Sequence, residues 1–150
     1  MRAVIQRVSS ASVTIDHKKI ASIEQGLLIL LGIECQDTQE DIDWLSHKII
    51  QLRIFNDKDG IMNCSAVDKN AQLLVVSQFT LFAKTKKGNR PSYIKAAPPS
   101  VSIPLYQSFV SSIQKLSTQK VETGQFGADM KIDLTNDGPV TIIIDTKNKE

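Results

Sequence analysis

The sequence predicts an α+β fold, a layered β/α sandwich in which a mainly antiparallel sheet packs against two principal helices. Three features predict this class: apolar and polar residues alternate near the amino terminus, two short apolar runs have the length of buried strands, and two segments repeat apolar residues at spacings of three and four. At 150 residues with 41% apolar composition, the chain is the size of one ordinary domain. We therefore expect residues 1–150 to form a single domain.

The alternating and apolar segments predict the strands. Residues 2–8 and 11–15 alternate with a period of two, and a polar turn separates them from residues 20–23, which predicts an antiparallel hairpin. The dense apolar run 27–33 is expected to be the central strand. Further strands are expected at 73–76, 131–134 and 141–145, the last two separated by a turn at 136–139.

Two amphipathic segments predict the helices. Thr38 followed by Asp41 matches a capping box, in which the two side chains satisfy amide donors at the start of a helix. The first apolar stripe, which Trp44 widens, consists of Ile42, Leu45, Ile49 and Leu52. The second stripe consists of Leu105, Phe109, Ile113 and Leu116, with Pro104 expected near the first turn, where a missing amide donor costs little.

A basic segment lies in the middle of the chain. Residues 69–121 contain eight Lys or Arg residues and no Asp or Glu, whereas the rest of the chain holds ten basic and sixteen acidic residues. Within it, residues 83–100 are rich in Lys, Arg, Gly and Pro, which predicts a long loop. Clustered cations attract phosphate, so the segment favours a polyanionic partner; a solvated lysine-rich loop accounts for the charge equally well.

The usual hydrolytic motifs are absent from the sequence. There is no G-x-S-x-G nucleophile elbow, no H-E-x-x-H zinc pair and no P-loop. His17 falls in an apparent turn and His47 in an expected helix, which argues against a Ser-His-acid triad and a histidine-rich metal site. We expect Cys35 and Cys64 to be reduced thiols, because neither lies in a short-spaced cluster.

Nothing in the sequence predicts a membrane segment. The longest uninterrupted apolar run, residues 27–31, is far shorter than the roughly 20 residues that a membrane span requires. The first residues alternate instead of forming the apolar core of a signal peptide. We therefore expect a cytoplasmic protein.

Two short segments hold candidate functional residues. Residues 77–80, Ser-Gln-Phe-Thr, follow a buried strand, and strand ends commonly present polar groups to a ligand; alternatively, these residues continue the core and satisfy local backbone groups. Gly138 and Pro139 form the second segment, because glycine lets another backbone approach closely. A plain turn between two strands is the alternative there.

The sequence is similar to the D-aminoacyl-tRNA deacylase family along nearly all of its length. The similarity covers the opening MRAVIQRVSSASV, the central LLVVSQFTLFA, the loop KGNRPSY with the following AAPP, and the closing VETGQFGADM and NDGPVT. SQFT and GPVT are signature motifs of that family, and both occur here in the right order. The resemblance implies an enzyme that hydrolyses the ester of D-aminoacyl-tRNA, and also glycyl-tRNA, as chiral proofreading in translation.

The resemblance also implies a two-fold homodimer with a site near each subunit boundary. In the family the Gly-Pro bond is cis, and Gly138 and Pro139 would reach into the partner's pocket with their carbonyls directed at the substrate's α-carbon region. Such a rigid wall admits a D-amino acid and collides with an L side chain. Arg7 matches the family's arginine on the first strand and would hold the partner's Gly-Pro segment; an ordinary surface charge is the alternative.

Within the pocket, the resemblance assigns the chemistry to Ser77, Gln78, Phe79 and Thr80. Gln78 and Phe79 would receive the terminal adenosine, and the Phe79 amide is a candidate donor to the ester or its developing oxyanion. Thr80 is the obvious nucleophile, but no base is visible in the sequence to activate it. The terminal ribose 2′-hydroxyl of the tRNA would instead help to position or activate the attacking water.

Other family positions complete the expected site. The pocket would be shaped by Ala97, Pro98 and Met130. The phosphates of the tRNA acceptor stem would be bound by Lys84, Lys86, Lys87 and Arg90. We expect no metal and no cofactor.

Three other interpretations stay open at this point. One is a purely structural dimer, which predicts no loss of activity in Gly138→Ala or Pro139→Ala. A non-catalytic RNA-binding module would use the same basic loop and Tyr93 but would need no stereochemical wall. A hydrolase of small esters or peptides would use Thr80 or a serine as its nucleophile. Deacylation turnover separates the RNA-binding module from an enzyme, and the activity of a Thr80→Val variant tests the hydrolase.

Overall fold

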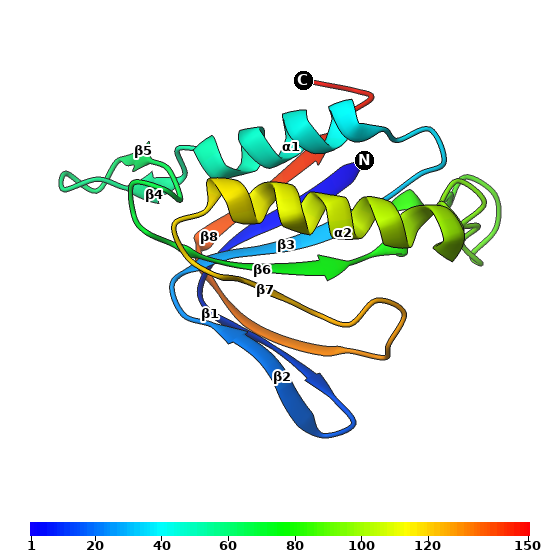
Figure 1. Cartoon of the computed structure of the whole chain (residues 1–150), viewed down its shortest axis with the longest axis horizontal. Helices are drawn as coiled ribbons and strands as arrows, with labels where there is room; N and C mark the ends of the chain where they lie inside the picture. The colour runs from blue at the N-terminus through cyan, green and yellow to red at the C-terminus, as the bar shows by residue number, and fades with distance from the viewer.

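The computed structural model describes all 150 residues and contains two main helices on one face of a six-stranded sheet (Figure 1). The strands of this sheet are β1 (Arg2–Ile15), β2 (Lys18–Ile23), β3 (Gly26–Gly32), β6 (Gln72–Ser77), β7 (Val121–Thr123) and β8 (Lys131–Asp145). A separate hairpin consists of β4 (Phe55–Asn56) and β5 (Met62–Cys64). The helices are α1 (Gln39–Gln51), α2 (Pro99–Leu116) and the short 3-10 helix η1 (Phe79–Phe82). None of them combines the length and the apolar character that crossing a membrane requires.

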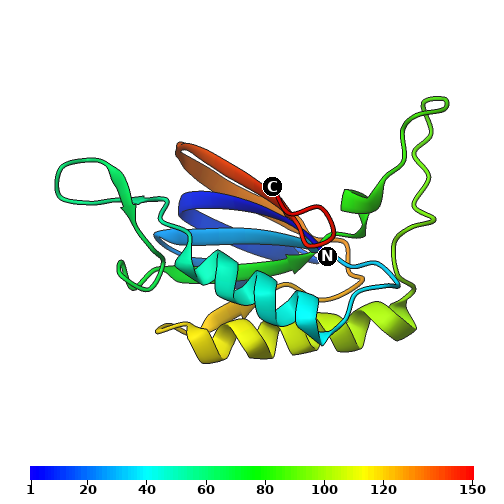
Figure 2. The ribbon, with the colours of Figure 1, turned by 90° about the horizontal axis from the view of Figure 1, so that it is seen from above.

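The sheet is antiparallel around β1 and parallel beyond β3. β1 pairs antiparallel with β2 and β3 on one side and with β8 on the other. β3 pairs parallel with β6, and β6 pairs parallel with β7. A parallel pair needs a long crossover, and α1 and α2 lie within the two crossovers, so both helices cover the same face of the sheet (Figures 1 and 2). The expected central position of the apolar run 27–33 is confirmed, because β3 lies between β1 and β6.

β8 differs from the expected pair of strands with a turn between them. It is a single strand that pairs along both halves of β1, with Asn136 opposite Val8 and Thr141 opposite Gln6. Residues 137–140 therefore face the single residue Arg7 and form a bulge. The bulge lets the strand continue past a glycine and a proline, and the Gly138–Pro139 peptide bond in it is cis.

The main core lies between the sheet and the two helices. The predicted helical stripes are confirmed there, because Ile42, Leu45, Ile49, Phe109 and Ile113 are fully buried. The predicted capping box is also present, with the Thr38 amide donating to Asp41 Oδ2 over 2.8 Å. A smaller core lies on the opposite face of the sheet, enclosed by the curled hairpin of β1 and β2 and the start of β8 (Figure 1).

α2 begins earlier than the sequence predicted. Its first residue is Pro99, and Pro104 lies inside the helix and not near its start. Proline is well suited to the first helical position, and the Ser102 hydroxyl donates to the Pro98 carbonyl over 3.0 Å in the first turn. Pro104 has no amide hydrogen to donate to the carbonyl oxygen of Ser100. Ser100 is exposed, so water can satisfy its carbonyl. The basic loop therefore ends at Pro98.

Tyr106 attaches α2 to the sheet. Its hydroxyl donates a hydrogen bond of 2.9 Å to the carbonyl oxygen of Val75 in β6, and its side chain is buried. This burial raises the pKa of the Tyr106 hydroxyl to about 12. The folded state therefore favours the neutral phenol.

We expect the Tyr106→Phe substitution to make stability less sensitive to alkaline pH. In the wild type the phenol ionises more readily in the unfolded chain, near the ordinary pKa of 10.0, so the free energy of unfolding falls as the pH rises from about 10 to about 12. The variant lacks this slope, and at neutral pH it loses one hydrogen bond, which costs about 1 kcal/mol. Urea unfolding at a series of pH values measures both effects. If the free energy of unfolding fell equally with pH in the two proteins, Tyr106 would not be the group with the raised pKa.

Candidate functional site

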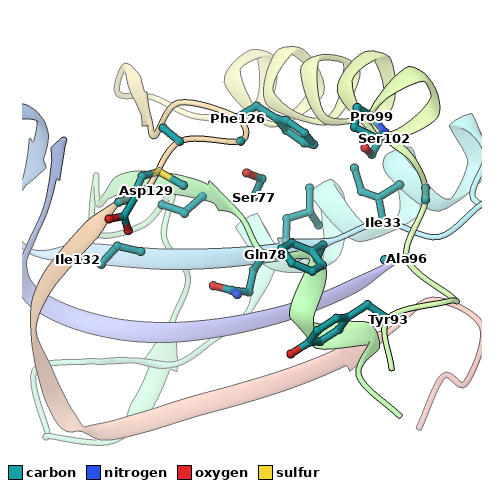
Figure 3. Close-up of a pocket in the computed structure, with 17 residues that line it drawn as sticks. Ile33, Ser77, Gln78, Tyr93, Ala96, Pro99, Ser102, Phe126, Asp129 and Ile132 are labelled. Atoms are coloured by element: carbon teal, nitrogen blue, oxygen red, sulfur yellow. The ribbon is translucent and has the colours of Figure 1, made fainter. Parts of the chain in front are cut away.

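A cavity of about 530 Å³ opens where β3 and β6 end (Figure 3). Leu31, Ile33 and Ser77 lie on its strand side, because the parallel pairing of β3 with β6 brings their carboxyl ends to the same edge of the sheet. The lining is mostly apolar, with a small number of polar groups. Such a cavity, with convergent polar groups at strand ends, is typical of a ligand site.

The segment that leaves β6 provides one wall of the cavity. The Gln78 amide donates to the Leu31 carbonyl over 2.7 Å, which continues the strand pairing by one residue. η1 then begins at Phe79, whose amide donates no hydrogen bond within the chain and whose side chain is 57% exposed. The first amides of a helix have no acceptor within it, so the Phe79 N–H is available to a ligand.

Thr80 lies beside the cavity but does not line it. Its hydroxyl oxygen accepts a hydrogen bond from the side-chain amide of Gln78. Neither histidine lines the cavity. The surroundings therefore contain no histidine base that could activate this hydroxyl.

Arg2 fastens η1 to the start of β1. Its Nη1 donates to the Leu81 carbonyl over 3.0 Å, and its guanidinium lies 4.8 Å from the ring centre of Phe82. The same side chain pairs with Asp145 at the end of β8 over 2.7 Å. Burial is the largest single effect and acts to raise the pKa of the Asp145 carboxyl. The hydrogen bonds from Arg2 and from the Lys147 amide, together with nearby positive charge, outweigh it and hold the pKa below its usual range. The position of the 3-10 turn thus depends on both ends of the chain.

The segment between β7 and β8 forms a second wall. It contributes Phe126, which packs edge-to-face against Tyr106 at 5.7 Å, and Met130. Gly124 is needed beside Met130, because a Cβ at position 124 would lie 2.5 Å from the methionine sulfur. The Gly124 amide donates to the Val75 carbonyl over 3.1 Å, which holds the segment next to β6.

The third wall is the end of the basic loop. The Ala97 amide donates to the Ile33 carbonyl over 2.9 Å, and the Ala96 amide donates to the Tyr93 carbonyl over 2.9 Å. Tyr93 lies at the rim, and in Figure 3 it occupies the side of the cavity opposite Phe126. These backbone contacts attach the loop to the end of β3.

The rest of the basic loop is a projecting arm, residues 84–92 (Figure 2). Lys84 and Ser92 exchange backbone hydrogen bonds of 2.8 and 3.0 Å at its base, which closes the arm as a narrow hairpin. The four cations predicted to contact tRNA are exposed and make no ion pair: they are Lys84, Lys86, Lys87 and Arg90. Their charge is free to meet an external anion.

Arg7 and the Gly138–Pro139 bulge lie at the other end of β3 from the cavity. Arg7 pairs with Leu27 at the start of β3, whereas the cavity contains Leu31. Arg7 is 6% exposed and contacts its own chain: Nε donates to the Asp137 carbonyl over 3.1 Å, and Nη1 donates to the Ile54 carbonyl over 2.6 Å. Arg7 therefore holds the bulge of its own chain, and the expected contact with the partner's segment stays a prediction.

The cavity brings together some of the residues that the sequence predicted for the site. The cavity gathers five of the expected residues: Ser77, Gln78, Phe79, Ala97 and Met130. Thr80 and Pro98 are sequence neighbours of lining residues, and Gly138 and Pro139 lie elsewhere in the same chain. The missed lining residues lie at the ends of β3 and β6, around the start of α2 and in the segment that leads into β8. They are Leu31, Ile33, Val76, Tyr93, Ala96, Pro99, Ser102, Phe126, Gly127, Ala128, Asp129 and Ile132. The family-like stretch VETGQFGADM was a usable signal for several of them, whereas nothing marked the end of β3.

The fold and the cavity define an α+β protein with a ligand site at strand ends and a cationic arm beside it. Residues 4–145 match the family model of D-Tyr-tRNA(Tyr) deacylase. D-aminoacyl-tRNA deacylases from Flavobacterium psychrophilum and Bacteroides fragilis are 67% and 61% identical to the chain over 150 residues, the full length of the chain and of each relative. The chain belongs to the D-Tyr-tRNA(Tyr) deacylase family, and it is a hydrolase that acts on carboxylic ester bonds.

Solved structures share this fold. The c-Myc DNA Unwinding Element Binding Protein superposes with a TM-score of 0.92 at 40% identity, covering 97% of this chain and 98% of that one. A probable eukaryotic D-amino acid tRNA deacylase gives a TM-score of 0.81 at 15% identity, covering 95% of this chain and 97% of that one. The second likeness concerns the fold alone.

We expect the Gly124→Ala substitution to impair the site more than the fold. The new Cβ would displace the Met130 thioether, which is flexible enough to move without a large loss of stability. The displaced thioether changes the cavity, and we expect kcat/KM for the ester substrate to fall about tenfold. Steady-state kinetics and thermal unfolding of both proteins measure these effects.

The matched control is the same substitution in a Met130→Ala background. The shorter side chain leaves room for the Cβ, so Gly124→Ala should then have little further effect on kcat/KM. Equal losses in the two backgrounds would show that Gly124 does not act through Met130.

Proposed function

We propose that this enzyme hydrolyses the ester joining a D-amino acid to the 3′ end of tRNA, and likewise glycyl-tRNA, as chiral proofreading. The observation that carries the proposal is the cavity at the ends of β3 and β6, with the free amide of Phe79 at its wall and the cationic arm beside it. D-aminoacyl-tRNA deacylases 58–67% identical to the chain support the same substrate class.

In this proposal the terminal adenosine and its aminoacyl group enter the cavity. Gln78 and Phe79 contact the adenosine. The Phe79 amide donates to the carbonyl oxygen of the ester as negative charge develops on that oxygen. Ala97 and Met130 shape the walls, and Pro98 holds the start of α2 through its carbonyl. A preorganised donor in a mostly apolar cavity stabilises the tetrahedral intermediate more than water does.

Water is the proposed nucleophile in preference to Thr80. The Thr80 hydroxyl is engaged by Gln78 and no histidine is close to it, so we assign it to the support of Gln78. The 2′-hydroxyl of the terminal ribose lies next to the scissile ester in any aminoacyl-tRNA. It therefore positions or activates the water, and the protein contributes orientation and the amide donor.

Selection against L-amino acids is assigned to Gly138 and Pro139 of a second subunit. Within one chain these residues lie at the far end of β3 from the cavity, so they contribute to a cavity only if two chains associate. Each bulge would then project its carbonyls into the partner's cavity and exclude an L side chain, while a D residue or glycine fits. Arg7 fixes the bulge from inside its own subunit through Asp137.

The surface of β8 supports the proposed homodimer. β8 pairs only with β1, so its outer edge carries unpaired backbone groups. Ile143 on this strand is 74% exposed and Leu134 is 37% exposed. An open strand edge with exposed apolar residues is normally covered by another chain or element. A second copy related by a two-fold axis would cover both features.

The arm is assigned to the tRNA acceptor stem. Lys84, Lys86, Lys87 and Arg90 are exposed and unpaired at one side of the cavity, where they can contact phosphate oxygens. Such contacts orient the RNA without reading its sequence. The enzyme would therefore accept many tRNAs.

We expect the purified protein to hydrolyse D-tyrosyl-tRNA and to leave matched L-tyrosyl-tRNA intact, with a metal chelator present throughout. The Thr80→Val variant, assayed beside it, should keep most of the activity because its hydroxyl is not the nucleophile. Release of the labelled amino acid measures both. Equal cleavage of the two esters would refute the assigned stereochemical selection. If both esters survived, the proposed deacylase activity would be wrong. An inactive Thr80→Val protein would support Thr80 as the nucleophile.

We expect Gly138→Ala to lower activity on D-tyrosyl-tRNA about tenfold or more and to reduce the preference for D over L. Gly138 has φ +125°, and a Cβ there would lie 2.8 Å from Arg7 Nη2 and 2.9 Å from Val140 Cγ2, so the bulge must shift. Gly60→Ala is the matched control, because Gly60 also has a positive φ, +80°, but no atom within 4 Å of the new Cβ. It should leave the D over L preference unchanged.

A mixing experiment tests the shared site directly. Gly138→Ala chains keep an intact cavity, and chains with Gln78→Ala keep an intact bulge. When equal amounts of the two chains pair at random, about half of the dimers are mixed. Each mixed dimer has one restored site, which combines the cavity of the Gly138→Ala chain with the bulge of the Gln78→Ala chain, so roughly a quarter of all sites are restored. No recovery in dimers shown by mass to be mixed would place the bulge outside the partner's cavity.

A further inference from the structure

Phe79 and Tyr93 form an exposed aromatic pair at the mouth of the cavity. Their ring centres are 5.1 Å apart and their planes meet at 75°, the edge-to-face arrangement that aromatic rings prefer. Phe79 is 57% exposed and Tyr93 is 37% exposed. In such an arrangement each ring keeps at least one face free of the other, so the pair presents flat apolar surface to solvent.

Tyr93 lies on the route from the cavity to the cationic arm. Its side chain lines the cavity rim, and the adjacent residue, Ser92, pairs with Lys84 at the base of the arm. Tyr93 lies at the rim of the cavity (Figure 3), and the arm that carries the exposed cations projects beyond it (Figure 2). Aromatic rings next to cations are the combination that binds single-stranded nucleic acid.

The backbone around Tyr93 is already ordered for binding. The Lys84–Ser92 bridge holds it on one side, and the Ala96 amide, which donates to the Tyr93 carbonyl, holds it on the other. No acidic residue occurs in the sequence between Lys69 and Val121, so the loop that carries Tyr93 has no carboxylate of its own to repel a phosphate. Pre-ordered aromatic surface loses little conformational freedom when a base stacks on it.

We propose that Tyr93 is a stacking platform for the base that precedes the terminal adenosine of the RNA. The inference rests on the proposed deacylase function, which puts the terminal adenosine inside the cavity. The preceding nucleotide then emerges at the rim, where Tyr93 stacks on its base and the arm neutralises its phosphate. Stacking tolerates any base, so Tyr93 reads the single-stranded form of the RNA end and not its sequence.

The test compares two substrates that differ outside the cavity. One is D-tyrosyl-tRNA and the other is adenosine carrying the same D-tyrosyl ester, which has no preceding nucleotide. We expect Tyr93→Ala to lower the kcat/KM ratio of the first to the second about tenfold, within the range of about 5- to 150-fold that loss of one stacked base produces. Tyr93→Phe should restore the ratio, because stacking needs the ring and not the hydroxyl.

A double-mutant cycle identifies the partner of the ring. Removing only the base of the penultimate nucleotide from D-tyrosyl-tRNA should lower kcat/KM about tenfold with the wild-type enzyme. With Tyr93→Ala, which has already lost the stacking contact, the same removal should lower kcat/KM hardly at all. Ile94→Ala is the matched control, since Ile94 is 79% exposed on the same loop and carries no ring. Its kcat/KM ratio should equal that of the wild type.

Several outcomes would overturn the inference. Equal losses on both substrates would make Tyr93 part of the cavity wall alone, and multiplicative losses in the cycle would mean that ring and base do not touch. Weaker dimerisation of Tyr93→Ala in sedimentation, with no change in the substrate ratio, would assign the ring to a second copy of the chain. A wild-type protein that hydrolysed neither ester would instead refute the proposed function, and this result is distinct from all of these.

Discussion

The parallel pairing of β3 with β6 is the constraint on which the rest of the structure depends. It brings Leu31 opposite Ser77, so two segments separated by a helix and a hairpin end at the same edge of the sheet. The crossover that parallel pairing requires contains α1, and the next one contains α2, which puts both helices on one face. The cavity lies at the edge where β3 and β6 end, and the Gln78 amide donates to the Leu31 carbonyl there.

The β8 bulge is a second constraint, beside the middle of β1 and at the other end of β3 from the cavity. Four residues, 137–140, stand opposite Arg7, whose buried guanidinium binds the Asp137 and Ile54 carbonyls. A fixed positive fork with several backbone acceptors holds the bulge in one conformation. Because this feature and the cavity lie at opposite ends of β3, the proposed stereochemical wall does not meet the cavity within a single chain. Two-fold association is the simplest way to join them.

The cavity has an unusual chemistry for a hydrolase, because it contains an unpaired backbone amide and no histidine. Backbone donors preorganised in an apolar site stabilise developing negative charge without titrating. In the proposed mechanism the remaining chemistry comes from the substrate, and the exposed aromatic pair and the arm hold the RNA end in position. The same surface would then both bind the RNA end and position it for catalysis.

The sequence alone determined the α+β class, both helical stripes, the capping box and the central strand, because local periodicity and composition encode them. It also marked residues 77–80, since a motif is contiguous. Only the tertiary structure decided that Pro99 starts α2, that residues 137–140 form a bulge in one strand, and that Leu31, Phe126 and Tyr93 share a cavity. Those outcomes depend on strand register and on contacts between distant segments, and no local pattern specifies which segments pair.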